Sequence, residues 1–114
     1  MYPDKTEDTQ GVVKMSRPRY YWFGIVKTII YQYPNKLDRG TIKGAEADIC
    51  IKKALNETSA AKDGEERMRL IDMVFVRKTH KVYGAASEIH ISESTAKRWI
   101  AEFVYLVAQN MGYL

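Results

Sequence analysis

The fold of this chain is decided by residues 81–105, which read KVYGAASEIHISESTAKRWIAEFVY. Ala85, Ala86 and Ile89 place small and apolar groups on one face of a short first helix. A second helix follows, in which apolar residues recur at steps of three and four, as they do on one buried helical face. The residues of this buried face are Ala96, Trp99, Ile100, Phe103, Val104 and Val107. The opposite face carries Ser94, Lys97, Arg98, Ala101, Glu102 and Tyr105.

The junction between the two helices has the residue types that a tight turn requires. Ser92 is expected to cap the second helix, because its hydroxyl can accept a hydrogen bond from a free amide of the first turn. Glu93 follows where the helix dipole favours an anion. The turn needs a residue that tolerates a left-handed backbone, and His90 is one of the non-glycine types enriched there. Because Ala86 also supplies the small residue that steeply crossing helices need, the stretch predicts a helix-turn-helix. The alternative is an ordinary helical hairpin with a solvated outer face.

The segment SEIHISESTAKRWI, residues 87–100, resembles the C-terminal part of the RinA family of phage transcriptional regulators and, more distantly, region 4 of sigma-70 factors. The shared run is an acidic residue, Ile-His-Ile-Ser, a second acidic residue, Thr-Ala and a basic residue. In this chain the run begins at Glu88 and ends at Lys97, within a match that covers residues 85–108. Residues 33–35, Tyr-Pro-Asn, also resemble the front of the family. The resemblance implies a phage-encoded regulator that activates late or packaging genes in a bacterial host.

Length and composition indicate one small domain that can bury a core. The chain has 114 residues, of which 46% are hydrophobic, and it lacks a run of about 18 apolar residues, so we expect no transmembrane helix. Its first residues are polar and acidic, unlike a signal or transit peptide. A single cysteine, Cys50, excludes an internal disulfide and a cysteine-based zinc site, and we expect a small buried thiol. These features fit a cytoplasmic protein, placed by the resemblance at the nucleoid of the host cell.

The chemistry of an enzyme is not visible in the sequence. His80 and His90 lack the spacing of metal ligands. We find neither a glycine-rich phosphate loop nor a Ser/His/Asp set with local support, and therefore expect no enzyme, no cofactor and no metal. The net charge of +4 is compatible with nucleic acid, but residues 62–114 hold eight Lys or Arg against seven Asp or Glu. DNA binding must therefore depend on where the charges are placed.

The N-terminal half is predicted to contain an arm and a strongly apolar helix. Residues 1–18 lack periodicity and are expected to be a flexible arm, whose basic end either follows a phosphate backbone or is simply disordered. Residues 19–33, RYYWFGIVKTIIYQY, predict a helix that ends at Pro34, with a strand as the alternative. Its main stripe is Phe23, Val26, Ile30 and Tyr33, widened by Trp22, Ile25 and Ile29. So many apolar groups must be covered either by the rest of the domain or by a second copy. Because they exceed what one helical face needs, we expect this helix to help form a homodimer.

The middle of the chain predicts two further helices separated by a linker. A turn-rich connector over 35–44 precedes a helix over 45–55, and residues 56–64 have linker composition. Asp63, with Glu66 three residues on, predicts a capping arrangement for a helix that runs to about Lys78. That helix should bury Met68, Ile71, Val74 and Phe75. The predicted architecture is all-α: an arm over 1–18, a helical region over 19–61, and a trihelical helix-turn-helix DNA-binding domain over 62–114.

A helix-turn-helix would bind double-stranded DNA through two groups of side chains. Side chains at the start of the second helix would enter the major groove, and cations before the first helix would contact phosphates. The expected DNA-contacting residues are Glu93, Ser94, Thr95, Lys97 and Arg98 on the second helix, and Arg77, Lys78 and Lys81 before the first. Arg98 could form two parallel hydrogen bonds with guanine, and Glu93 could accept a hydrogen bond from the amino group of cytosine. Thr95 could support the fold instead of contacting DNA.

Two other functions fit the same residues. If the likeness to sigma-70 region 4 is the deeper one, the chain acts with host RNA polymerase as a sigma-like factor, and the 19–33 helix binds protein. The second function is that of a packaging component, similar to a small terminase subunit, which binds DNA within a ring. A ring predicts an oligomer larger than a dimer, whereas a regulator predicts a monomer or dimer.

Overall fold

The computed structural model describes residues 20–33 and 40–113, which form helices and the turns between them. The helices are α1 (Trp22–Gln32), α2 (Ile42–Ala60), α3 (Gly64–Ile71), α4 (Val82–Glu88) and α5 (Glu93–Asn110), and a π-helical turn, η1 (Asp72–Val76), continues α3. The predicted all-α class is confirmed for the described residues, and the strand alternative is wrong over 22–32, which form α1. The predicted arm over 1–18 and residues 35–39 of the predicted connector lie outside the described residues.

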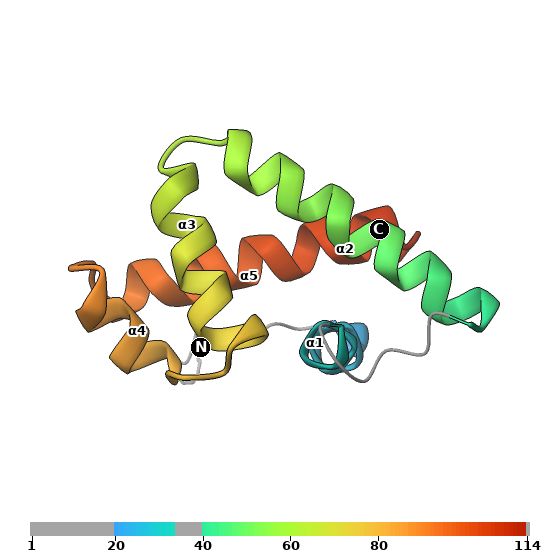
Figure 1. Ribbon diagram of the computed structural model, residues 1–114, viewed down its shortest axis with the longest axis horizontal. Coiled ribbons are helices and arrows are strands. Elements are labelled where there is room, and N and C mark those ends of the chain that lie inside the picture. The colour runs from blue at the N-terminus through green and yellow to red at the C-terminus, as the bar shows by residue number, and fades with distance from the viewer. Residues whose placement is uncertain (1–19, 34–39, 114) are drawn as a thin grey trace, which may run out of the picture.

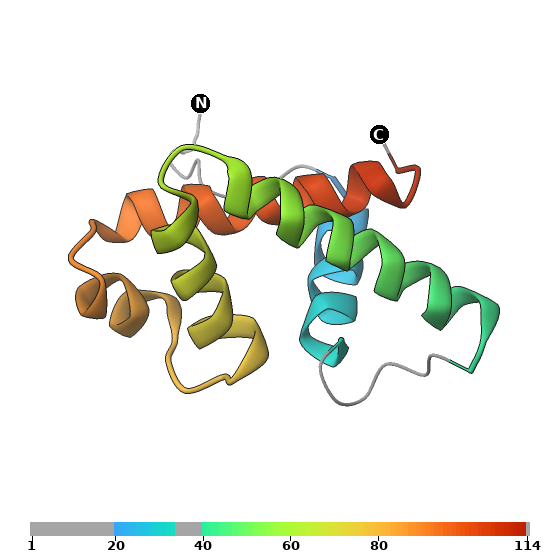
Figure 2. The same ribbon diagram turned by 45° about the horizontal axis from the view of Figure 1, so that its top comes forward.

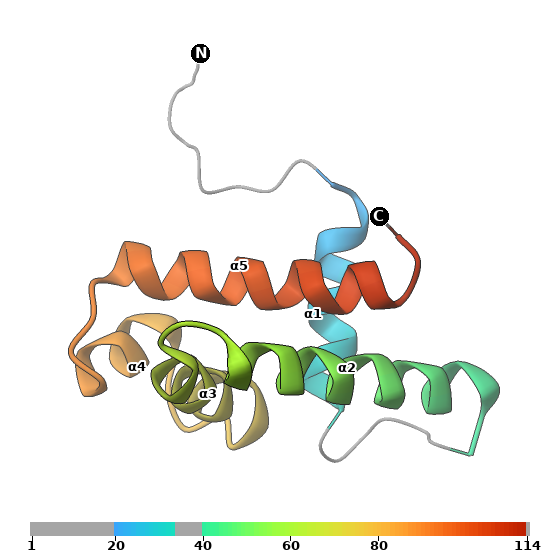
Figure 3. The same cartoon turned by 90° about the horizontal axis from the view of Figure 1, so that it is seen from above.

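Helix α5 is the element against which most of the others pack. It runs antiparallel to α2 and lies beside it, while α1 crosses both (Figure 1, Figure 3). The start of α5 lies with α3 and α4 at one end of the molecule, and its last turns lie with α1 and α2 toward the other (Figure 2). One hydrophobic core joins these elements and includes Trp22, Ile51, Phe75, Ala86 and Phe103. The core therefore spans both predicted segments, 19–61 and 62–114.

Helix α1 directs its apolar face at this core. Trp22, Val26 and Ile30 are at most 3% exposed, whereas Phe23 and Tyr33 of the predicted stripe are half-buried. The buried face is therefore centred closer to Trp22 than the sequence pattern indicates. Because Val26 and Ile30 are covered by the chain itself, they are not available to a second copy. Of the residues predicted to widen the stripe, Ile25 stays 49% exposed.

Helix α2 is longer than predicted at both ends. Thr41 caps its start, where the Gly44 amide donates to the Thr41 hydroxyl over 2.9 Å. Its last turn continues through residues 56–60, so the predicted linker is wrong there and the turn is confined to 61–63. Thr58 is 4% exposed in this last turn. Burial of this face outweighs the weak helix propensity of the Asn, Thr and Ser residues around it.

The joint between α2 and α3 is tight. Asp63 occupies the position before α3, as predicted, but its φ is 58° and its side chain makes no capping hydrogen bond, so the predicted capping arrangement is wrong. Gly64 follows, and a Cβ atom there would lie 2.2 Å from the carbonyl oxygen of Ser59. The close approach of the two helices thus depends on the missing side chain of Gly64.

Helix α3 does not continue to Lys78 as one regular helix. Ile71, Val74 and Phe75 are buried as predicted, but Met68 is half-buried. The Arg77 amide donates to the Asp72 carbonyl five residues back over 2.8 Å, which marks the π-helical turn. Lys78 then ends the helix with φ 55°, and the Thr79 amide bonds to the Met73 carbonyl. This pattern is the helix-ending arrangement that usually places glycine at the left-handed position.

The far end of α5 is fastened to α2. The Cys50 thiol donates to the Asn110 carbonyl over 3.3 Å, and the Asn110 side-chain amide donates to the Cys50 carbonyl over 3.1 Å. Cys50 is buried as predicted, and burial raises the pKa of its thiol, with the Glu46 carboxylate adding to the effect. Gly112 follows the end of α5 with φ 92°, in the left-handed region that glycine tolerates. None of the helices formed by the described residues has the length and apolar character that crossing a bilayer requires.

Candidate nucleic-acid interface

Helices α4 and α5 are joined by a four-residue turn whose conformation matches the prediction. His90 has φ 61°, which confirms the expected left-handed residue in the turn. Ile89 is buried and Ile91 is half-buried against the core, so the two side chains hold the turn from both sides. Ala85 and Ala86 are at most 2% exposed, as expected for small residues where α4 meets the core. The α4–α5 unit is therefore fixed by apolar contacts on both sides of His90.

The start of α5 is capped by its own hydroxyl groups. The Thr95 amide donates to the Ser92 hydroxyl over 3.1 Å, which confirms the predicted cap. The Ser92 hydroxyl in turn donates to the Thr95 hydroxyl over 2.9 Å. The hydroxyl oxygens of Ser92 and Ser94 lie 3.3 Å apart. Thr95 is half-buried within this cap. The sequence allows Thr95 either to contact DNA or to support the fold. These hydrogen bonds match the second role, in which Thr95 stabilises the start of α5.

The polar face of α5 is exposed over its first two turns. Glu93, Ser94, Lys97 and Arg98 are exposed, as predicted. Every residue from 101 to 108 is at least half-buried, so the expectation of an exposed face that continues to Tyr105 is wrong. Aromatic rings cover this part of α5: the ring centroid of Tyr105 lies 5.7 Å from that of Trp22 on α1. A groove of DNA could therefore receive only the first two turns of α5.

Two acidic side chains lie beside the two basic side chains on this face. Glu93 pairs with Lys97 one turn later, with 3.1 Å between the carboxylate oxygen and the ammonium nitrogen. Glu102 lies 3.9 Å from Nε of Arg98, also one turn later. The side chains of Lys97 and Arg98 remain 53% and 62% exposed. Such exposed pairs are weak, so both cations can exchange a carboxylate for a phosphate or a base edge.

The three basic residues before α4 have different surroundings. Arg77 donates to the Asp72 carboxylate over 2.6 Å, so its charge is partly neutralised in the free protein. Lys78 and Lys81 are exposed, and within residues 20–33 and 40–113 neither makes an ion pair. Lys81 is the residue that precedes α4, and its side chain makes no capping bond. Lys78 and Lys81 are thus the cations of this group with the fewest competing contacts.

Replacing Lys78 by glycine is expected to stabilise the fold and to weaken DNA binding. The left-handed φ of Lys78 costs a side-chain-bearing residue roughly 1 kcal/mol that glycine avoids. We therefore expect the free energy of unfolding, from urea denaturation, to rise by up to about 1 kcal/mol. If this surface contacts DNA, the affinity for random duplex DNA should fall, because one exposed positive charge is lost. An unchanged affinity in the stabilised variant would remove Lys78 from the interface.

Arg67 and Glu102, which were not among the expected site residues, form a contact between α3 and α5 next to the exposed face of α5. Arg67 on α3 places its guanidinium 5.1 Å from the ring centroid of Trp99 and donates to Glu102 over 2.6 Å. Arg67 is four residues into α3 and 35 residues from its carboxylate partner. No local pattern connects two residues so far apart in the sequence. The spacing of Trp99 and Glu102, three residues apart on α5, was the available signal that both face the same neighbour.

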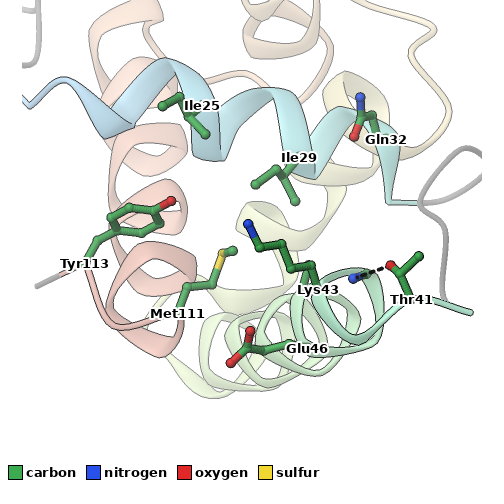
Figure 4. Close-up of a pocket in the computed structure, with 10 residues that line it drawn as sticks. Ile25, Ile29, Gln32, Thr41, Lys43, Glu46, Met111 and Tyr113 are labelled. Atoms are coloured by element: carbon green, nitrogen blue, oxygen red, sulfur yellow. Dashed lines mark hydrogen bonds between the residues drawn. The ribbon is translucent and has the colours of Figure 1, made fainter.

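A second surface feature is an apolar groove of about 500 Å³ at the other end of the molecule. Ile25 and Ile29 of α1 form one side of the groove (Figure 4). Met111 and Tyr113, which follow the last turn of α5, form the second side (Figure 4). Lys43, Glu46 and other residues of the first turns of α2 form the third side (Figure 4). The groove is separate from the start of α5, which lies with α3 and α4 (Figure 2).

The described residues include no group of three or more His, Cys, Asp or Glu side chains placed to hold a metal ion. Comparisons of this chain with known protein families, with curated proteins and with solved structures find no match.

Proposed function

We propose that the chain is a sequence-specific DNA-binding regulator of transcription in which α4 and α5 act as a helix-turn-helix. The observation that carries the proposal is the limited exposure of α5. Its first two turns present Glu93, Ser94, Lys97 and Arg98 to solvent, and its remaining turns are covered by α1, α2 and α3. A recognition helix has this form, because its first turns enter the major groove while the rest belongs to the core.

The proposed contacts divide between bases and phosphates. Arg98 and Lys97 are long, exposed cations near the start of α5, where a side chain can reach a guanine edge. Ser94 and Glu93 can contact an adjacent base or phosphate, and Glu93 can accept from cytosine. Lys78 and Lys81 precede α4 and would hold the sugar-phosphate backbone. Arg77 would join them only after it exchanges Asp72 for a phosphate.

The resemblance of residues 85–108 to the RinA family supports a phage regulator that activates late or packaging genes inside a bacterial host. The sigma-like and packaging functions use the same DNA-binding surface and differ in their partners. The apolar groove beside α1 gives a protein contact a place to form, whether with RNA polymerase or with a second copy. Light scattering on the purified protein separates a packaging ring from a monomeric or dimeric regulator.

Replacing Arg98 and Lys81 by alanine is expected to affect DNA binding in two different ways. Arg98→Ala should cost about 1–3 kcal/mol on the preferred duplex and little on random DNA, because a base contact is lost. Lys81→Ala should weaken both duplexes alike and flatten the slope of log affinity against log salt by about one unit. Fluorescence anisotropy titrations at several salt concentrations measure both effects.

Lys53→Ala is the matched control, because Lys53 is exposed on α2 and lies outside the α4–α5 unit. It should leave the salt slope and both affinities unchanged. Equal losses on both duplexes for Arg98→Ala would make Arg98 a phosphate contact. If neither variant weakens binding on either duplex, the α4–α5 surface is not the DNA-binding site.

A further inference from the structure

The guanidinium of Arg67 is an unusually well-held group for so small a protein. Its side chain is 20% exposed and lies over the ring of Trp99, with 5.1 Å from the guanidinium carbon to the ring centroid. One terminal nitrogen donates to Oε1 of Glu102 over 2.6 Å, and its buried Nε has no hydrogen-bond partner among residues 20–33 and 40–113. Packing on a buried indole restricts the motion of Arg67, so it can serve as a fixed point for Glu102.

Glu102 contacts two arginines at once. Its Oε1 accepts from Arg67 on α3, and its Oε2 lies 3.9 Å from Nε of Arg98, one turn earlier on α5. One oxygen of the carboxylate is held from the α3 side, and the other oxygen is the one nearer to Arg98. An exposed arginine on a helix otherwise samples many rotamers and loses that freedom when it binds.

We propose that Glu102 is a positioning residue that aims Arg98 at a guanine edge. The inference rests on the proposed function of α5. The Arg98 atom that lies nearest to the Glu102 carboxylate is Nε, at 3.9 Å, so the attraction does not require the two terminal nitrogens. These nitrogens form the fork that binds O6 and N7 of guanine. Arg67 holds the Glu102 carboxylate and packs on Trp99, so the charge that attracts Arg98 is fixed in place by the core. A part of the cost of ordering Arg98, limited by the weakness of an exposed pair, is then met before DNA arrives.

Glu102 also adds negative charge beside the DNA. Its carboxylate lowers the affinity for any phosphate backbone while it favours one geometry of Arg98. Removing the charge should therefore have opposite effects on two kinds of duplex. Binding to random DNA should stay equal or become tighter. The preference for the guanine-containing site should fall by up to about five-fold, the most that an exposed ion pair supplies.

The test compares Glu102→Gln with the parent on the preferred duplex and on the same duplex with the guanine contacted by Arg98 replaced. Glu65→Gln is the charge-matched control, because Glu65 is exposed on α3 and, among the residues described, forms no ion pair. It should change neither the preference nor its salt dependence. A readout without DNA is the ¹⁵N relaxation of the Nε–H group of Arg98, which should report faster motion in Glu102→Gln and no change in Glu65→Gln.

The outcomes separate this inference from the proposed function. A Glu102→Gln protein that keeps both the guanine preference and the restricted Arg98 signal overturns the positioning role, even if Arg98→Ala abolishes the preference. A uniform loss on both duplexes also overturns it, because that result indicates a role in stability alone. A parent protein that shows no preference for any duplex overturns the proposed function, and the positioning role falls with it.

Discussion

Replacing Trp99 by alanine is expected to lower the free energy of unfolding by roughly 3–5 kcal/mol, the range for a large aromatic side chain deleted from a core. Trp99 is 6% exposed and belongs to the core beneath the first turns of α5. Its ring also carries the guanidinium of Arg67, which would lose its support. Urea denaturation followed by circular dichroism measures the change.

Tyr83→Ala is the control for this prediction, since Tyr83 is a large aromatic residue that is 70% exposed on α4. A surface substitution of this kind usually changes stability by at most about 0.5 kcal/mol. If Trp99→Ala denatures at the same urea concentration as the parent but fails to bind DNA, the ring contacts bases rather than the core, and the orientation proposed for α5 is wrong.

Replacing Gly64 by alanine is expected to cost about 3 kcal/mol of unfolding free energy. The added Cβ would lie 2.2 Å from the Ser59 carbonyl oxygen, and the carbonyl oxygen of Thr58 would be 2.9 Å away. Both atoms belong to the backbone at the end of α2, so the helix itself would have to move. Since α3 carries Arg67, such a shift should also disturb the support of Glu102.

Gly24→Ala is the control for Gly64→Ala, because it is the same substitution at a position where the added Cβ meets no other atom. Gly24 lies within α1, and a Cβ there would have no atom within 4 Å. Alanine at an exposed helix position is favoured over glycine by about 1 kcal/mol, so this variant should be stabilised. The same urea experiment compares the two. A Gly64→Ala protein that is as stable as the parent would mean that α2 and α3 do not meet as closely as the fold requires.

The features that the sequence predicts well are those set by neighbouring residues. The cap at Ser92 depends on an amide three residues away, and the left-handed turn at His90 depends on that residue's own backbone preference. The buried face of α5 follows from spacing within a single helix, and all six residues expected on it are buried.

The features that the sequence does not predict depend on partners distant in the chain. Thr58 has weak helix propensity, yet α2 continues through it because that face is buried in the fold. Val26 fits a dimer surface by pattern alone, and its burial becomes visible only when α5 and η1 are placed beside α1. The contact of Arg67 with Glu102 spans 35 residues and two helices. Charge and spacing in the sequence therefore predict the exposed residues at the start of α5. The contact of Arg67 on α3 with Glu102 on α5 becomes visible only in the folded structure.

The most direct test of the account is selection of bound sequences from a random duplex library, carried out in parallel with the parent protein and with Arg98→Ala. The parent is expected to enrich a short motif that contains guanine, and Arg98→Ala is expected to enrich the same motif without the preference at that guanine. A parent protein that enriches no motif, or an Arg98→Ala protein that enriches an identical one, would contradict the assignment of α5 as the helix that reads DNA.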